Sequence, residues 1–92
     1  MAILLNSETK EPVFLVEGNR EVYDFHTNKL LFTASNNSIC DVSGKRVFYF
    51  KDGNKIFDEN DVYVYQMRGI VIWDVSKNKP IFEFKIDNPR NR

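Results

Sequence analysis

The chain has 92 residues and a mass of 10.8 kDa, a length that suits one small domain with a thin core. Thirteen basic and thirteen acidic side chains cancel, which argues against a nucleic-acid binder that relies on a basic field and against an acidic DNA mimic. A single cysteine excludes an internal disulfide, and no segment resembles a secretory signal or the roughly 20 apolar residues of a membrane helix. We therefore expect a cytoplasmic protein with no membrane partner.

The composition favours strands over helices. Phenylalanine, tyrosine, valine and isoleucine are plentiful, whereas alanine occurs only at Ala2 and Ala34. Apolar residues do not recur with helical spacing over three turns anywhere in the chain. The high content of asparagine, lysine, isoleucine and phenylalanine indicates an AT-rich genome, which suggests a bacterial or phage source. We expect an all-β protein.

Two leading apolar runs open the chain. The first is Ala2–Leu5 and the second is Val13–Val16, and a polar segment separates them. Each run has the length of a short strand. The sequence therefore predicts leading strands within residues 2–17.

A short repeat follows these runs. An apolar pair followed by aspartate occurs four times, and the aspartates are spaced by 17, 17 and 16 residues. A turn precedes each pair, and a second turn and a second apolar run follow it. A period this short fits two strands and two tight turns and is too short for a helical repeat. The four aspartates are Asp24, Asp41, Asp58 and Asp74.

The repeat predicts the architecture. Lys51-Asp52-Gly53-Asn54 contains Asp-Gly, a strong hairpin signal, so successive strands should pair antiparallel with their neighbours. We expect an up-and-down meander of nine or ten strands, curled into a small barrel or a two-layer sheet. Its parts are one domain over residues 1–86, with repeats at 18–34, 35–51, 52–67 and 68–86, and a flexible basic tail at 87–92.

The second strands of the repeats are apolar in both alternating phases. A lone sheet with one solvent-facing side would alternate apolar and polar residues, so these strands have more apolar surface than one thin core can use. Large exposed apolar patches are uncommon on soluble monomers, and we expect a partner to cover this one. The candidate interface residues are Phe48, Tyr49, Phe50, Tyr63, Tyr65, Trp73, Phe82 and Phe84.

The repeated aspartates are interpreted as turn-forming residues. Each stands where a strand ends, a place where an aspartate side chain accepts backbone N–H bonds. A row of sugar or metal ligands remains the alternative if the sheet closes into a ring. Asp52, Asn54 and Ile56 match three positions of the mannose-binding motif of monocot-type lectins. Phe50 and Asp58 stand where that motif has glutamine and tyrosine, so the chain is not assigned to that family.

No catalytic or cofactor site is predicted. Cys40 and His26 are the only residues of their types, and together they would have to form any cysteine–histidine nucleophile pair. Cys40 occupies the slot that Tyr23, Phe57 and Trp73 hold in the other repeats, which indicates a structural residue. One cysteine and one histidine do not suffice for a zinc site, and the chain lacks a glycine-rich phosphate loop. We expect no enzyme, no cofactor and no metal.

Charge is uneven along the chain. Residues 67–92 hold three acidic and six basic side chains, while the rest of the chain leans acidic. A nucleic-acid contact at this end is the alternative to a solvated tail, and we expect the tail. The first hypothesis for function is a non-enzymatic protein-interaction module that self-associates through an aromatic sheet face, such as a small bacterial or phage inhibitor or immunity-type protein. The alternative is a carbohydrate- or small-ligand-binding β-domain.

Overall fold

Ten short strands form the part of the chain that this computed structural model describes, residues 1–18 and 20–86. The expected tail at 87–92 lies outside the described residues. In chain order the strands are β1 (Ala2–Asn6), β2 (Pro12–Glu17), β3 (Glu21–Asp24), β4 (Leu30–Ser35), β5 (Ser38–Asp41), β6 (Arg46–Lys51), β7 (Lys55–Asp58), β8 (Tyr63–Arg68), β9 (Val71–Asp74) and β10 (Lys79–Ile86).

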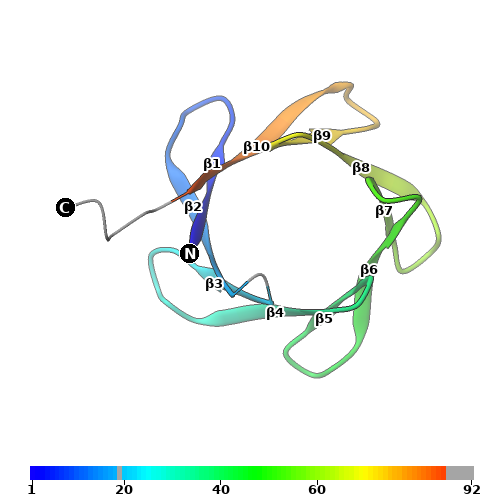
Figure 1. The fold of residues 1–92 in the computed structure, drawn as a ribbon, viewed down its shortest axis with the longest axis horizontal. Helices are drawn as coiled ribbons and strands as arrows, with labels where there is room; N and C mark the ends of the chain where they lie inside the picture. Colours follow the sequence, from blue (N-terminus) through cyan, green and yellow to red (C-terminus); the bar gives the residue numbers. More distant parts are fainter. Residues whose placement is uncertain (19, 87–92) are drawn as a thin grey trace.

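The strands form one closed antiparallel barrel. Each strand pairs with its neighbours in the sequence, and β10 pairs with β1 along five residue pairs, from Ala2–Ile86 to Asn6–Phe82. Figure 1 shows the resulting ring, with five hairpin loops splaying outward from it. The predicted all-β, up-and-down meander is confirmed, and of the two closures left open the barrel is the one that forms. Closure leaves no unpaired strand edge in the described sheet.

The barrel is built from two-strand units. Each unit has a short first strand and a longer second strand, and the second strand carries one extra residue that breaks the pairing register. Such a bulge strengthens the local twist, which helps short strands close into a barrel. The extra residues are all branched and apolar: Val13, Leu31, Val47, Val64 and Ile81.

The leading strands form a fifth unit of the same construction. Strands β1 and β2 carry the bulge at Val13, and Asn6 holds the place that aspartate holds in the four repeats. The Ser7 N–H donates to the Ile81 carbonyl of the last unit at 2.9 Å, just as the Val75 N–H donates to Val64 at 3.0 Å. The first unit is therefore joined to the last in the way that other neighbouring units are joined.

One face of every strand lies inside the ring. Cross-strand partners share a face, and the face that carries the buried residues Ala2, Leu4 and Ile56 is the interior. In each unit an aliphatic side chain of the first strand faces an aromatic side chain of the second. The five pairs are Leu4–Phe14, Val22–Phe32, Ile39–Phe48, Ile56–Tyr65 and Ile72–Phe82.

The interior is a thin core. Ile56, at 5% exposure, is the most enclosed large side chain among the described residues, and the inner aromatic residues are only half-buried. The inner rings meet across the intervening strand, with centroids 5.5 Å apart for Phe14 and Phe82 and 5.9 Å apart for Phe48 and Tyr65. A single ring of aromatic and aliphatic pairs therefore supplies most of the apolar packing.

Candidate functional site

The pairing register divides the eight candidate interface residues between the two faces of the barrel wall. Five of them lie on the inner face with the core: Phe48, Phe50, Tyr65, Phe82 and Phe84. Three lie on the outer face: Tyr49, Tyr63 and Trp73. Closure of the barrel thus uses one of the two apolar faces as core, and only the outer residues remain candidates for contact with a partner.

An aromatic ladder, consisting of Tyr49, Phe57 and Tyr63, crosses the outer face of β6, β7 and β8. The three residues are direct cross-strand partners. Their ring centroids are 5.4 Å apart at both steps, and the ring planes differ by 14° and 27°. Aromatic pairs in such stacked arrangements contribute about 0.5–1.5 kcal/mol beyond the area they bury. All three side chains are half-buried.

Phe57 was not among the candidate interface residues. The alternation along β7 contains the signal that could have found it, because Phe57 shares a phase with Tyr23 and Trp73, whereas Ile56 points to the core. What the sequence could not show is that Phe57 lies directly between Tyr49 and Tyr63. That placement depends on the bulge at Val64, which sets the register between β7 and β8.

Basic side chains lie over each ring of the ladder. The guanidinium carbon of Arg46 is 4.6 Å from the Tyr49 ring centroid. The ammonium group of Lys51 is 5.8 Å from the Phe57 centroid, and that of Lys55 is 5.8 Å from the Tyr63 centroid. A cation at this range is attracted to the ring, by about 0.5–1 kcal/mol at an exposed site, and its alkyl stem covers apolar surface. The second apolar face is thus partly covered by the protein's own basic residues.

Trp73 extends this surface onto β9. The guanidinium carbon of Arg68 is 4.2 Å from the Trp73 ring, and the Arg68 Nε–H donates a 2.8 Å hydrogen bond to Gln66 Oε1. Gln66 is the cross-strand partner of both Lys55 and Trp73, so Trp73 lies in the cross-strand row of Lys51 and Lys55, beside the row of the ladder. We call the whole patch the basic-aromatic surface: Arg46, Tyr49, Lys51, Lys55, Phe57, Tyr63, Arg68 and Trp73.

One acidic residue anchors the edge of the ladder. The Tyr49 hydroxyl donates a 2.7 Å hydrogen bond to Oδ1 of Asp61, in the loop between β7 and β8. This bond, together with partial desolvation, raises the pKa of Tyr49 above its usual value. The Tyr49 ring is therefore held in place from two sides, by Asp61 at the hydroxyl and by Phe57 along the ladder.

Each of the four repeated aspartates is the last residue of a strand, at the start of its own hairpin loop. In each loop Oδ1 accepts hydrogen bonds from the turn that follows: Asp24 from the N–H groups of His26 and Thr27, both at 2.9 Å, and Asp58 from Asn60 and Val62 at 2.8 and 3.0 Å. Within the described ranges, no three histidine, cysteine or acidic side chains come together as metal ligands would. Ring closure does not make the aspartates converge.

Asp41 and Asp74 combine backbone and hydroxyl donors. Asp41 Oδ1 accepts from the Ser43 hydroxyl at 2.6 Å and from the Ser43 N–H at 2.9 Å, and Asp74 Oδ1 accepts from the Ser76 hydroxyl at 2.8 Å and the Lys77 N–H at 3.0 Å. These bonds favour the ionised form and lower the pKa of both carboxyl groups, and backbone N–H bonds lower the pKa of Asp24 in the same way.

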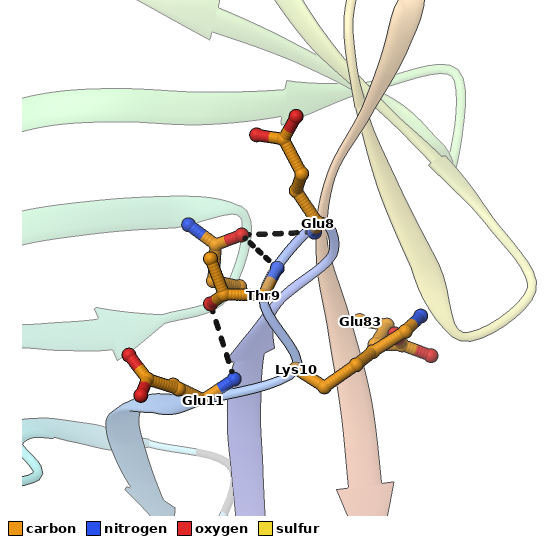
Figure 2. Close-up of polar contacts among 6 residues, drawn as sticks. Glu8, Thr9, Lys10, Glu11 and Glu83 are labelled. Atoms are coloured by element: carbon orange, nitrogen blue, oxygen red, sulfur yellow. Dashed lines mark hydrogen bonds and ion pairs between the residues drawn. The ribbon is translucent and has the colours of Figure 1, made fainter.

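Asn6 makes the same turn in the first unit. Its side-chain oxygen accepts hydrogen bonds from the N–H groups of Glu8 and Thr9, at 2.8 and 3.0 Å, and both of these residues are labelled in Figure 2. Lys10 of this loop forms an ion pair with Glu83 of β10. An amide oxygen therefore performs the same role as the carboxylates, and a turn at this position does not require a negative charge.

An acidic surface lies on the opposite side of the ring. Glu17 and Glu21 are direct cross-strand partners on β2 and β3, and the Tyr23 hydroxyl donates a 3.2 Å hydrogen bond to Glu21. Desolvation and this bond raise the pKa of Tyr23. A hollow of about 500 Å³ adjoins the two carboxylates, and it is lined by Glu17, Gly18, Arg20, Glu21, Thr33, Ala34 and Ser35.

Cys40 and His26 occupy different elements. Cys40 is a half-exposed residue of β5 and pairs across the strands with Thr33 and Arg46. His26 is exposed in the loop after β3, where its ring meets Phe25 edge-on at 5.4 Å. In the described part of the chain no hydrogen bond joins the two side chains. The described residues also contain no apolar helix of the length that a bilayer crossing requires.

Comparisons of this chain with models of protein families, with curated proteins and with solved structures found no match.

Proposed function

We propose that this protein is a non-enzymatic interaction module that binds an acidic protein surface through the basic-aromatic surface. One observation carries the proposal: on the outer wall of β6–β9, the three stacked rings of the ladder and the ring of Trp73 are accompanied by outward-facing charged strand residues that are all basic. These are Arg46, Lys51, Lys55 and Arg68.

The chemistry of this surface resembles that of protein-binding hot spots. Tyrosine, tryptophan and arginine are enriched among the residues that dominate binding energy, because they bury large areas and still offer a polar group. Tyr49, Trp73 and Arg46 supply these side chains here. Basic groups around the rings favour encounter with an acidic partner and disfavour a basic one.

Carbohydrate binding is the second candidate, supported by the exposed aromatic rings. A sugar would need a free ring face to stack on, and a cation already lies over each ring of the ladder. The same argument applies to the bases of single-stranded nucleic acids, and the acidic residue Asp61 at the edge of the ladder would repel a phosphate group. A sugar or a base could stack on these rings only if the cations moved away. A protein partner that contacts the ring edges and the cations together requires no such movement.

The proposal is tested by titrating ¹⁵N-labelled protein with a peptide of alternating glutamate and leucine. We expect chemical-shift changes confined to β6–β9, weakened by added salt. The variant Phe57→Ser should lose the response, and the matched variant Tyr23→Ser, on the outer face of β3, should keep it. Changes elsewhere on the barrel, or a stronger response to a neutral oligosaccharide or a single-stranded oligonucleotide, would show that the proposal is wrong.

A further inference from the structure

The acidic surface, defined as Glu17, Glu21 and Tyr23, carries two carboxylates, and Arg20 is the basic residue that lines the adjoining hollow. Glu17 and Glu21 face each other directly across β2 and β3, and like charges in this position destabilise a sheet. The ion pairs among the described residues join Lys10 to Glu83, Lys45 to Glu59 and Lys55 to Asp52. Neither Glu17 nor Glu21 takes part in them, so a basic group supplied from outside would relieve the repulsion.

The two charged surfaces lie on opposite sides of the barrel. In Figure 1, β2 and β3 stand at the left of the ring, and β7 and β8 stand across it at the right. One molecule therefore carries both halves of a complementary pair but cannot join them within itself. A symmetric face-to-face dimer would place Lys51 and Lys55 against their own copies, which charge repulsion disfavours.

We infer that the partner of the basic-aromatic surface is a second copy of this chain, which binds through its acidic surface. The inference rests on the proposed function and names its partner. The hollow of about 500 Å³ beside Glu17 and Glu21 offers room for a long basic side chain of the neighbouring molecule. Tyr23, half-buried on the same outer face, offers a ring to the aromatic ladder.

The contact is heterologous and leaves one free surface of each kind at the ends of the assembly. Because the two surfaces lie on opposite sides of the ring, a third copy can add to the second in the same way. The protein therefore forms open head-to-tail chains. Since much of the attraction is between exposed charges, salt should weaken it strongly.

Sedimentation velocity and light scattering on the full chain test this inference with two charge-reversal variants. Glu17→Lys/Glu21→Lys removes the acidic surface, and Lys51→Glu/Lys55→Glu removes the basic one. We expect the average mass of the wild type to rise with concentration at low salt and to return to that of the monomer at high salt. Each variant alone should remain a monomer, because its two surfaces then carry charge of the same sign. The mixture should associate again, because each surface of one variant meets an oppositely charged surface of the other.

A wild type that stays monomeric at millimolar concentration and low salt, or a mixture that stays monomeric, would overturn the inference. The glutamate–leucine peptide separates this failure from failure of the proposed function. If Glu17→Lys/Glu21→Lys binds the peptide and Lys51→Glu/Lys55→Glu does not, the basic-aromatic surface binds acidic protein and its partner is another protein. If both variants bind the peptide equally, the proposed function is wrong as well.

Circular dichroism checks that the variants fold, and Glu17→Gln/Glu21→Gln provides a milder variant of the acidic surface.

Discussion

Strands β6 and β8 carry aromatic rings on both faces of the barrel wall, and the inner and outer rows of rings are packed differently. On the inner face Phe48 meets Phe32 and Tyr65 at interplanar angles of 64° and 58°. On the outer face the rings of the ladder are nearly parallel, at 14° and 27°, and have cations over them. Inner rings pack against rings from alternate strands across the curve of the barrel, whereas outer rings can only lie beside their neighbours. The same residue type therefore forms the core on one face and a stacked, cation-covered outer surface on the other.

The largest effect should come from the inner row. Phe48 contacts two other rings of the core, so Phe48→Ala should lower the free energy of unfolding by roughly 2–3 kcal/mol, somewhat less than for a fully enclosed phenylalanine. That is a large part of the total for a small domain. Urea denaturation followed by circular dichroism measures it. An effect below that of the same substitution in the outer row would break the distinction between the two faces.

The outer row provides the matched substitution. Phe57→Ala removes one ring from the middle of the ladder, with two stacked neighbours, and should cost about 1 kcal/mol. Urea denaturation under the same conditions allows direct comparison with Phe48→Ala. For binding of an acidic peptide the order should be reversed: Phe57→Ala should lose more affinity than Phe48→Ala, because only Phe57 belongs to the surface that we propose as the contact. Equal losses of stability would mean that the ladder is part of the core.

A smaller effect is expected from the cation that lies over the ladder. Arg46→Ala should lower stability by about 0.5 kcal/mol, since the exposed guanidinium group lies over the half-buried ring of Tyr49. High salt should reduce the difference between wild type and variant only in part, because the alkyl stem of Arg46 also covers the Tyr49 ring. A chemical denaturation series at two ionic strengths checks this. A complete loss of the difference at high salt would assign the whole effect to charge.

A fall in pH should weaken the hairpin turns that begin at the repeated aspartates. Asp24, Asp41 and Asp74 have lowered pKa values in the folded state, so their contribution to stability is present above the pKa of about 3.9 of the unfolded chain. It is lost as the pH falls through the folded values. The variant Asp24→Asn/Asp41→Asn/Asp74→Asn should therefore melt at a lower temperature than the wild type at pH 7 and at the same temperature near pH 2. Thermal unfolding across this range provides the measurement.

Because the first unit makes the same turn with Asn6, we expect the difference in melting temperature between the wild type and the asparagine variant to be small. Asn6 accepts the same turn bonds without a charge, so an asparagine variant keeps the acceptor and loses only its ionisation. Replacement by alanine should lower the melting temperature further, because the turn N–H groups then lose their protein partner. If the asparagine and alanine variants melt alike, the oxygen acceptor contributes nothing and the turns are held by their backbone bonds alone.

Much of the fold could be predicted from the repeat. The period of about 17 residues implies two short strands, and the position of each aspartate marks the hairpin loop that its side chain then organises. The first unit was harder to recognise, because Asn6 replaces aspartate and no turn precedes β1. The candidate site was found only in part: Tyr49, Tyr63 and Trp73 were expected, whereas Phe57 and the basic residues over the rings were not.

The sequence by itself determined the strands, their order and the turns between them, because alternation and turn chemistry act over a few neighbouring residues. The tertiary structure decided which apolar phase became core. One extra residue in every second strand shifts the register, and a shift of one residue exchanges the two faces. It also decided closure, since β1 and β10 pair across almost the whole chain, and closure alone places the acidic and basic surfaces on opposite sides of one ring.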